Sequence, residues 1–281
     1  MNPTPAITRL TDLEHNGLGP YRTLRRQEAH LKEGIFVAEG EKVVRRLMAS
    51  GLAIRSMLLT PQWYSSLFQD EPTGPGVPVY SPGAAIYIAE KSLLESIVGF
   101  SLHQGIMAVG MTPGERPLAE YFNPGLRDRI LCVALDDLVN AENVGLVIRN
   151  CAAFGADPVI CGETSGNAYL RRSVRASMGT VFGANIVHSR DIVETLGLLR
   201  GEFGVRVIAA DPAGPEEIYR VSMTGPVCVV VGHEGTGIRR KVLDVCDVRA
   251  AIPMWSRTDS LNVSSACAVF LAEARRQRLT P

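Results

Sequence analysis

Six short apolar runs in the second half of the chain constrain its fold more than any other feature. They read RILCVAL, DPVICG, ANIVH, VRVIAA, PVCVVVG and VRAAIPM, and stretches with helical spacing separate them. The runs lack the alternation of polar and apolar residues that is typical of strands exposed on one face, so both faces of the sheet must be covered. The pattern predicts an α/β fold with a mostly parallel sheet.

The first third of the chain predicts a second, smaller α/β unit. Short strands are expected at GIFVAEG, AIRSMLLT, VPVYSP and SLHQGIMAVG. A stretch rich in Pro and Gly, TPGERPLAEYFNPG, then marks a connection between domains. We therefore expect an N-terminal domain at residues 1–111, a linker at residues 112–125 and a C-terminal domain at residues 126–281.

The composition excludes several classes of protein. Hydrophobic residues make up 46% and charged residues 21% of the chain, as in ordinary globular proteins. The first residues lack the basic and apolar regions of a signal peptide, and no apolar run reaches the length of about 18 residues that a membrane span needs. We therefore expect a cytoplasmic protein without membrane contact. The six cysteines stand singly in apolar runs, which predicts buried thiols rather than a zinc site or disulfides.

Local charge must carry any contact with nucleic acid, because the formal net charge of the whole chain is zero. The stretch from Thr164 to Arg190 contains no acidic residue and carries Arg171, Arg172 and Arg175. In a helix this spacing places the three guanidinium groups on one side. Charge alone leaves two interpretations open, a solvated helix face and a surface that binds phosphates.

Three polar corners follow strands of the predicted parallel sheet, where ligands usually bind. At the first corner Asn143 is positioned to cap a helix that ends at Gly155. Arg149 lies within this helix, where a long cation is ordinarily a surface residue whose stem packs on apolar neighbours.

The second corner is a glycine-rich turn after PVCVVVG, in which backbone N–H groups can approach a ligand closely. It is not a Walker A loop, because Ile238 stands where that motif requires Lys, and it does not follow the order GxGxxG. The turn alone is also compatible with a nucleotide-dependent oxidoreductase on a Rossmann-like sheet.

The third corner reads IPMWSRTDSLNVSSACAVF, with polar residues between two apolar runs. Ser260 is expected to cap a helix that starts near Leu261. Capping does not account for Asn262 and Ser264 together, which favours a ligand-binding role for the first turn.

Taken together, the three corners resemble the signature motifs of the SpoU/TrmH family of RNA 2′-O-ribose methyltransferases, part of the SPOUT class. The first motif, N-x-G-x-x-x-R, corresponds to Asn143, Gly145 and Arg149. The second, G-x-E-G-x-G, corresponds to Gly232, Glu234, Gly235 and Gly237. The third, I-P-M followed by S-L-N-V-S, corresponds to residues 252–254 and 260–264.

The resemblance covers nearly the whole chain. Residues 34–51 and the segment HQGIMAVG resemble the family's N-terminal RNA-binding domain of the ribosomal protein L30e type. One departure is visible, since many members carry glycine two residues after the methionine of the third motif, where this chain has Ser256 beside Trp255.

The resemblance implies a C-terminal SPOUT domain tied into a deep trefoil knot, a homodimer with active sites near the subunit interface, and S-adenosylmethionine as cofactor. It implies no metal. The residues implied to bind the cofactor, mostly through backbone groups, are Gly232, Ile252, Leu261, Ala209, Ala210, Pro253 and Asn262.

The reaction implied is methyl transfer to a ribose 2′-hydroxyl of structured RNA, with ribosomal RNA favoured over transfer RNA. A catalytically silent RNA-binding protein that keeps the knot is the remaining alternative. The implied catalytic residues are Arg149, Asn143, Glu234, Asn262 and Ser264. Because arginine stays protonated, we interpret Arg149 as a phosphate clamp and electrostatic stabiliser rather than as a base. Glu234 is expected to orient Asn143 or Arg149.

The charge map then favours RNA binding for the basic segment, with further contacts from the N-terminal domain. The arginines expected to bind RNA are Arg171, Arg172, Arg175, Arg22, Arg25, Arg26, Arg45 and Arg46.

Overall fold

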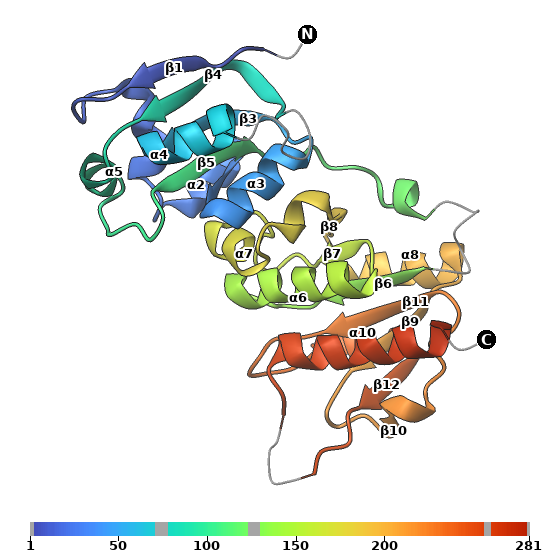
Figure 1. Cartoon of the computed structure of the whole chain (residues 1–281). Helices are drawn as coiled ribbons and strands as arrows, with labels where there is room; N and C mark the ends of the chain where they lie inside the picture. Colours follow the sequence, from blue (N-terminus) through green and yellow to red (C-terminus); the bar gives the residue numbers. More distant parts are fainter. Residues whose placement is uncertain (1–2, 71–77, 123–129, 256–259, 280–281) are drawn as a thin grey trace. The chain divides into compact units, whose positions relative to one another are not determined.

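The structure, a computed structural model, describes residues 3–70, 78–122, 130–255 and 260–279 (Figure 1). The chain forms two compact units. Unit 1 consists of Met1–Gly114 and Tyr169–Gly183, and unit 2 consists of Glu115–Ala168 and Ala184–Pro281. The chain therefore passes between the units three times, whereas the sequence predicts a single passage between residues 111 and 126.

Unit 1 contains a mixed five-stranded sheet. Its strands in spatial order are β1 (Ala6–Arg9), β4 (Tyr80–Ile88), β3 (Ile54–Leu59), β5 (Ile106–Met111) and β2 (Ile35–Glu39). The four strands expected from the sequence are confirmed as β2 to β5, although β4 runs on to Ile88. Strand β1 is new, and its mostly exposed residues carry no apolar signal.

Short helices accompany this sheet. They are α1 (Gly19–Arg22), α2 (Gln27–Lys32), α3 (Glu41–Ala49), α4 (Pro61–Ser65) and α5 (Lys91–Val98). The core beneath them includes Leu18, Tyr21, Val37, Leu58 and Met107.

The segment 169–183 packs within unit 1 although its flanking residues belong to unit 2. It carries α7 (Arg171–Ala176) and a 3₁₀ turn at Thr180–Gly183. The ring of Phe36 on β2 stacks on Phe182 at 5.1 Å between centroids and contacts Tyr169 at 5.5 Å. We call this segment the docked segment.

Unit 2 contains a seven-stranded sheet in which every neighbouring pair is parallel. Its strands in spatial order are β10 (Glu216–Glu217), β12 (Val248–Ala251), β9 (Arg206–Ala210), β11 (Val227–Val231), β6 (Leu131–Leu135), β7 (Val159–Cys161) and β8 (Ile186–His188). All six strands expected from the apolar runs are present, which confirms the predicted α/β class with a mostly parallel sheet. The added strand β10 is two exposed residues long.

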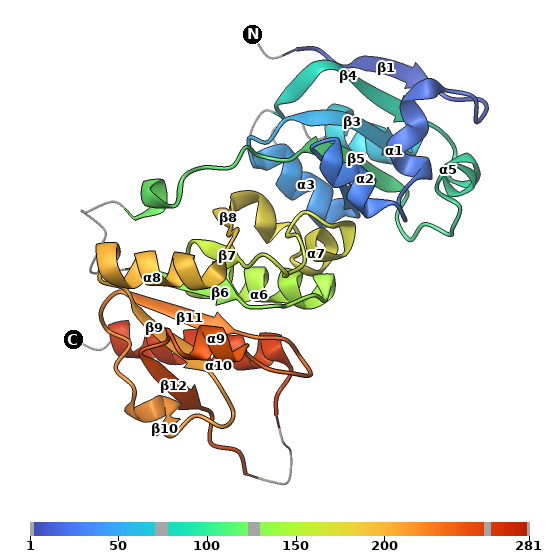
Figure 2. The same ribbon diagram turned by 180° about the vertical axis from the view of Figure 1, so that it is seen from behind.

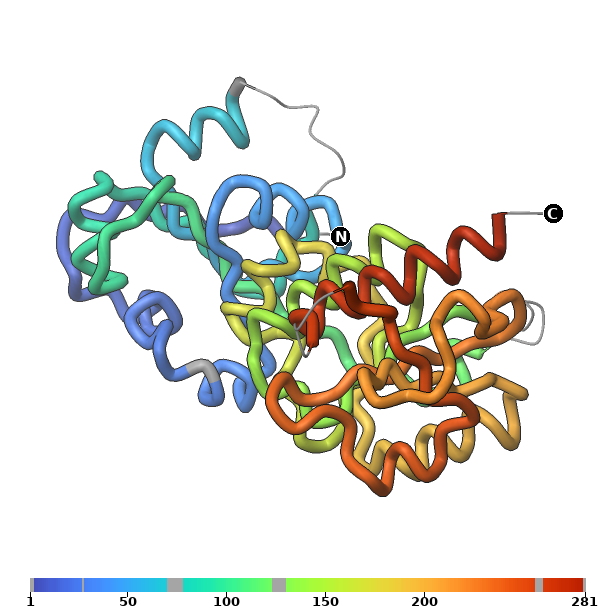
Figure 3. The backbone as a smooth tube through the Cα atoms, turned by 90° about the horizontal axis from the view of Figure 1, so that it is seen from below, coloured from blue at the N-terminus to red at the C-terminus, as the bar shows by residue number. Residues whose placement is uncertain are grey.

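Helices cover both faces of this sheet, as the apolar strands require. Figure 1 shows α6 (Ala141–Phe154) and α10 (Val263–Leu279) in front of the strands. Figure 2, seen from behind, shows α8 (Ile192–Phe203) and α9 (Arg240–Leu243) on the opposite face. Helix α10 packs against α6, so the C-terminal end of the chain returns to the first helix of the unit (Figure 3).

Buried side chains behave as the sequence predicts. All six cysteines are free thiols, five of them buried and Cys246 half-buried. Within the described ranges, no helix combines the length and the apolar character needed to cross a membrane.

Candidate functional site

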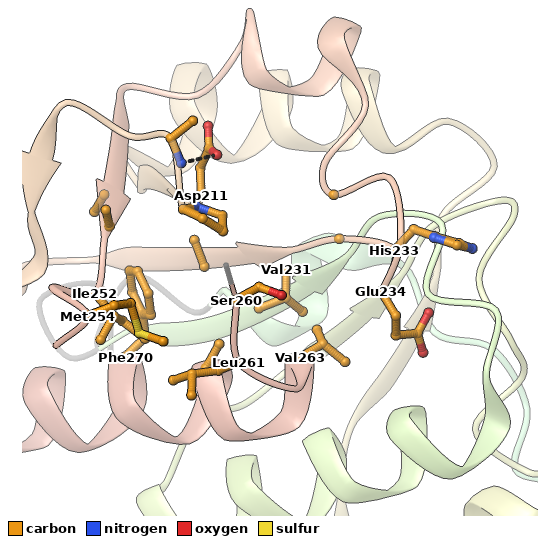
Figure 4. A pocket seen from close by; sticks show the side chains of 18 of the residues that line it. Asp211, Val231, His233, Glu234, Ile252, Met254, Ser260, Leu261, Val263 and Phe270 are labelled. Atoms are coloured by element: carbon orange, nitrogen blue, oxygen red, sulfur yellow. Dashed lines mark hydrogen bonds between the residues drawn. The ribbon is translucent and has the colours of Figure 1, made fainter. Parts of the chain in front are cut away.

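A pocket of about 680 Å³ opens in unit 2, where the parallel strands end (Figure 4). The loops after β9, β11 and β12 line it together with the start of α10. These three strands are neighbours in the sheet, so their loops emerge side by side. Five of the predicted cofactor residues lie in this lining, namely Ala210, Gly232, Ile252, Pro253 and Leu261.

Two predicted cofactor residues lie outside the lining. Ala209 is fully buried in the core between the sheet and α8, because alternate strand residues point to opposite faces. Its side chain therefore does not face the pocket, and a cofactor contact of Ala209 through its backbone stays a prediction. Asn262 is instead part of a hydrogen-bond chain beside the pocket.

The first corner differs from the prediction in its cap. Asn140 caps α6, and its side-chain oxygen accepts from the backbone N–H groups of Glu142 at 2.9 Å and Asn143 at 3.4 Å. Asn143 therefore lies inside the first turn, and its own amide is free to contact other loops. The helix ends before Gly155 at φ 72°, as predicted.

The glycine turn after β11 requires glycine for two separate reasons. A Cβ atom on Gly232 would lie 2.5 Å from the backbone of Gly237 and Ile238, which no real side chain tolerates. Gly237 has a φ of 71°, in the left-handed region. Reciprocal backbone hydrogen bonds of 3.1 and 2.9 Å between His233 and Gly237 close the turn.

The third corner also has a different cap from the one predicted. Helix α10 begins at Val263, and Asn262 caps it by accepting from the backbone N–H of Ser264 at 2.9 Å and from its hydroxyl at 2.6 Å. Ser260 is exposed and lines the pocket instead, a role that its sequence context did not indicate. Ser256 lies outside the described residues, and the adjacent Trp255 is fully exposed.

A directed chain of hydrogen bonds joins the three corners. The Ser264 hydroxyl donates to Asn262, the Asn262 amide donates to Asn143 at 3.3 Å, and the Asn143 amide donates to Glu234 at 2.5 Å. Every donor in this chain points toward the Glu234 carboxylate, which also lines the pocket. Residues of all three corners therefore meet beside the pocket, and the bonded pair Asn143 and Asn262 is 119 positions apart in the sequence.

Arg149 does not join this chain. Its side chain is exposed and forms no hydrogen bond with any residue that the structure describes. The neighbouring Asn150 does take part, because its amide donates to the Ser264 carbonyl at 2.7 Å. Asn150 lies seven residues after Asn143 and so on the same face of α6, a spacing that was available in the sequence.

A buried ion pair anchors the far end of the glycine turn. The Asp136 carboxylate is fully buried and accepts from the Arg239 backbone N–H and from its Nε, both at 2.7 Å. The Arg239 guanidinium also pairs with Glu163 at 2.9 Å. Burial alone would raise the pKa of Glu163, but hydrogen bonds from Arg239 and from backbone amides outweigh it and lower this pKa to about 2. A carboxylate directly after an apolar strand was the sequence signal for this pair.

The predicted RNA-binding arginines fall into two groups. Arg172 and Arg175 on α7 and Arg22, Arg25 and Arg26 near the N-terminus are exposed.

The other three arginines already have partners within unit 1. Arg45 pairs with Glu41, and Arg46 donates to the Met178 carbonyl at 2.8 Å. Arg171 pairs with Glu39 and lies over the Phe100 ring at 5.0 Å, so its guanidinium is already engaged within unit 1 and its contact with RNA stays a prediction.

Comparisons with known proteins agree with this architecture. Residues 130–272 match the SpoU rRNA Methylase family. A Mycobacterium bovis protein described as an uncharacterized tRNA/rRNA methyltransferase is 31% identical over 257 residues, which is 90% of this chain and 84% of the relative.

Solved structures share the fold over nearly the whole chain. An rRNA methyltransferase from Sinorhizobium meliloti was crystallised with AdoMet, that is, S-adenosylmethionine. It has a TM-score of 0.81 at 23% identity, and the match covers 98% of this chain and 99% of the Sinorhizobium chain. A putative RNA methyltransferase of the TrmH family from Porphyromonas gingivalis has a TM-score of 0.77 at 27% identity, with coverages of 94% and 99%. The family match spans half of the chain and the curated relative spans most of it, so this protein belongs to the SpoU rRNA methylase family.

Proposed function

We propose that the protein transfers a methyl group from S-adenosylmethionine to a ribose 2′-hydroxyl of RNA. The observation that carries the proposal is the hydrogen-bond chain from Ser264 to Glu234 beside a pocket at the ends of parallel strands. Glu234 belongs to both features, because its carboxylate ends the chain and lines the pocket. A methyl donor bound in the pocket would therefore lie next to this polar group.

The pocket residues fit S-adenosylmethionine. A volume of about 680 Å³ lies within the usual range of about 300–1,000 Å³ for sites that bind ligands of this size. Leu261, Val263 and Phe270 offer apolar surface for a nucleobase, Gly232 offers backbone groups without a side chain, and Ile252 adds its backbone groups at the end of β12. When bound, the cofactor supplies a methyl group on a sulfonium ion.

The residues of the chain would do the rest by positioning and charge. Methyl transfer requires the attacking oxygen within about 3 Å of the methyl carbon and opposite the sulfur. Arg149 is exposed and has no hydrogen-bond partner among the residues that the structure describes, so it is suited to hold an RNA phosphate and to stabilise negative charge that develops on the ribose oxygen. The Glu234 carboxylate fixes the Asn143 amide, which in turn fixes Asn262 at the start of α10.

Four finer features belong to the proposal. Ribosomal RNA is the expected substrate, since the family description refers to rRNA. Unit 1 is proposed to bind RNA as an L30e-type domain through its exposed arginines. The return of α10 to α6 after β12 is in keeping with a deep trefoil knot in unit 2. A homodimer with active sites near its interface is proposed from the family resemblance.

The test is a methyl-transfer assay with tritiated S-adenosylmethionine and total RNA from cells that lack the protein. Label is expected in RNA at a nuclease-resistant 2′-O-methyl nucleotide, and mapping that site distinguishes ribosomal from transfer RNA. Label on a base would overturn the 2′-hydroxyl assignment, and RNA binding without transfer would indicate the catalytically silent alternative.

Arg149→Ala tests the assigned chemistry. Loss of a charge-stabilising donor should lower turnover by about 100-fold or more, while binding of S-adenosylmethionine by calorimetry stays near that of the wild type. Arg275→Ala, which changes an exposed arginine on α10, serves as the matched control. Unchanged turnover in Arg149→Ala would remove this residue from the mechanism.

A further inference from the structure

The side chain of His233 occupies the inside of the glycine turn. Its Nδ1 atom accepts hydrogen bonds from the backbone N–H of Gly235 at 2.9 Å and of Thr236 at 3.2 Å. The backbone of the same residue exchanges two hydrogen bonds with Gly237. His233 therefore forms four hydrogen bonds within a turn of only five residues.

These bonds bear directly on Glu234. The residue before it is fixed by the bonds to Gly237, and the residue after it is fixed by the bond from Gly235 to the imidazole. Two glycines in the turn would otherwise leave the backbone with wide conformational freedom. His233 is one of the residues that line the pocket, and Figure 4 shows its ring directed away from the labelled apolar residues there.

We propose that His233 is a positioning residue that holds the Glu234 carboxylate in hydrogen-bond contact with Asn143. Its effect on catalysis rests on the proposed methyl transfer, but its effect on the turn does not. Gly235 and Thr236 are exposed, so water can replace the imidazole as acceptor in a variant. Loss of the side chain should therefore disorder the turn without unfolding the protein.

Loss of the His233 side chain should lower turnover more than it weakens cofactor binding. Gly232 is held by its place at the end of β11 and by its close contact with Gly237, which no His233 side chain is needed to maintain. A displaced Glu234 would instead misplace Asn143, and small displacements of catalytic groups lower turnover by about tenfold to a hundredfold.

Three substitutions separate the acceptor from the bulk of the side chain. His233→Ala removes both, His233→Leu keeps apolar bulk, and His233→Asn keeps an acceptor the same number of bonds from Cα, as in an Asx turn. We expect kcat to fall at least about tenfold in the Ala and Leu variants and to recover to near the wild-type value in the Asn variant. The Kd for S-adenosylmethionine should change far less than kcat.

Amide hydrogen exchange of the intact protein gives a readout that needs no activity. The amides of Gly235 and Thr236 should exchange faster in His233→Ala and His233→Leu, and recover protection in His233→Asn, while the melting temperature stays constant. A wild type that does not methylate RNA would refute the proposed function yet leave this exchange pattern intact. Unchanged exchange in His233→Ala, or rescue by Leu rather than by Asn, would overturn the role assigned to His233.

Discussion

Arg171→Ala should destabilise the protein, although the charge pattern of the sequence groups this residue with two arginines on a phosphate-binding face. Its Nε and Nη2 atoms donate to one Glu39 oxygen at 3.0 and 2.5 Å, and the two side chains are only 20% and 16% exposed. The guanidinium also lies over Phe100. Removing Arg171 therefore leaves a largely buried carboxylate without its cation.

The size of the effect follows from this burial. Exposed ion pairs contribute about 0–1 kcal/mol, and breaking a buried pair costs about 3–5 kcal/mol. For this intermediate case we expect a loss of about 2–3 kcal/mol, including about 0.5–1 kcal/mol from the contact with the aromatic ring. In a unit of this size the melting temperature should fall by about 5–10 °C.

The assay is thermal unfolding followed by circular dichroism, paired with RNA binding at several salt concentrations. Arg172→Ala and Arg175→Ala are matched controls on the same helix, and as exposed residues they should change stability by less than about 0.5 kcal/mol. If they contact phosphates, each should reduce the slope of log affinity against log salt by about 0.7–0.9. An Arg171→Ala protein with unchanged melting temperature and a reduced salt slope would refute the structural role of the pair.

Two further predictions concern the stability of the units. Deletion of residues 1–110 removes Phe36 and uncovers Phe182 and Tyr169 of the docked segment, so the product should aggregate or unfold without cooperativity. A truncated protein that is monodisperse in size-exclusion chromatography and unfolds cooperatively in calorimetry would contradict this. Glu163 has a lowered pKa, so its contribution to stability is full above its ordinary pKa of about 4.5 and is lost as pH falls toward about 2. Glu163→Gln should cost about 1–2 kcal/mol at pH 7, after allowance for solvent screening, and should flatten the acid dependence of urea unfolding between those values. Equal acid dependence in the two proteins would show that the pair with Arg239 contributes nothing.

The sheet of unit 2 was predictable because burial on two faces imposes apolar runs that are visible locally. Strand β10, with two exposed residues, and β1, with one half-buried residue among exposed ones, leave no such trace. Helix caps were predicted with the right residue types but at the wrong positions. Asn140 and Asn143 both suit an N-cap, and nothing in the local sequence decides which of them begins the helix.

The sequence predicts which residues form the site better than it predicts the hydrogen bonds among them. Parallel strands bring their loops to one edge, and the motif resemblance selected Asn143, Glu234 and Asn262. The direction of the hydrogen bonds among them depends on side-chain orientation, which no spacing rule supplies. Likewise the partner of Arg171 lies 132 residues away in the sequence, and no local pattern pairs it with Glu39.

The three passages of the chain between the units also affect how the protein is made. Unit 1 cannot complete its core until Phe182 has left the ribosome. By then β6, α6 and β7 of unit 2 have been synthesised, but the strands that pair with them, β11 and β8, have not. The nascent halves therefore mature together rather than one after the other. For the same reason neither half can be exchanged between relatives by a single crossover in the gene.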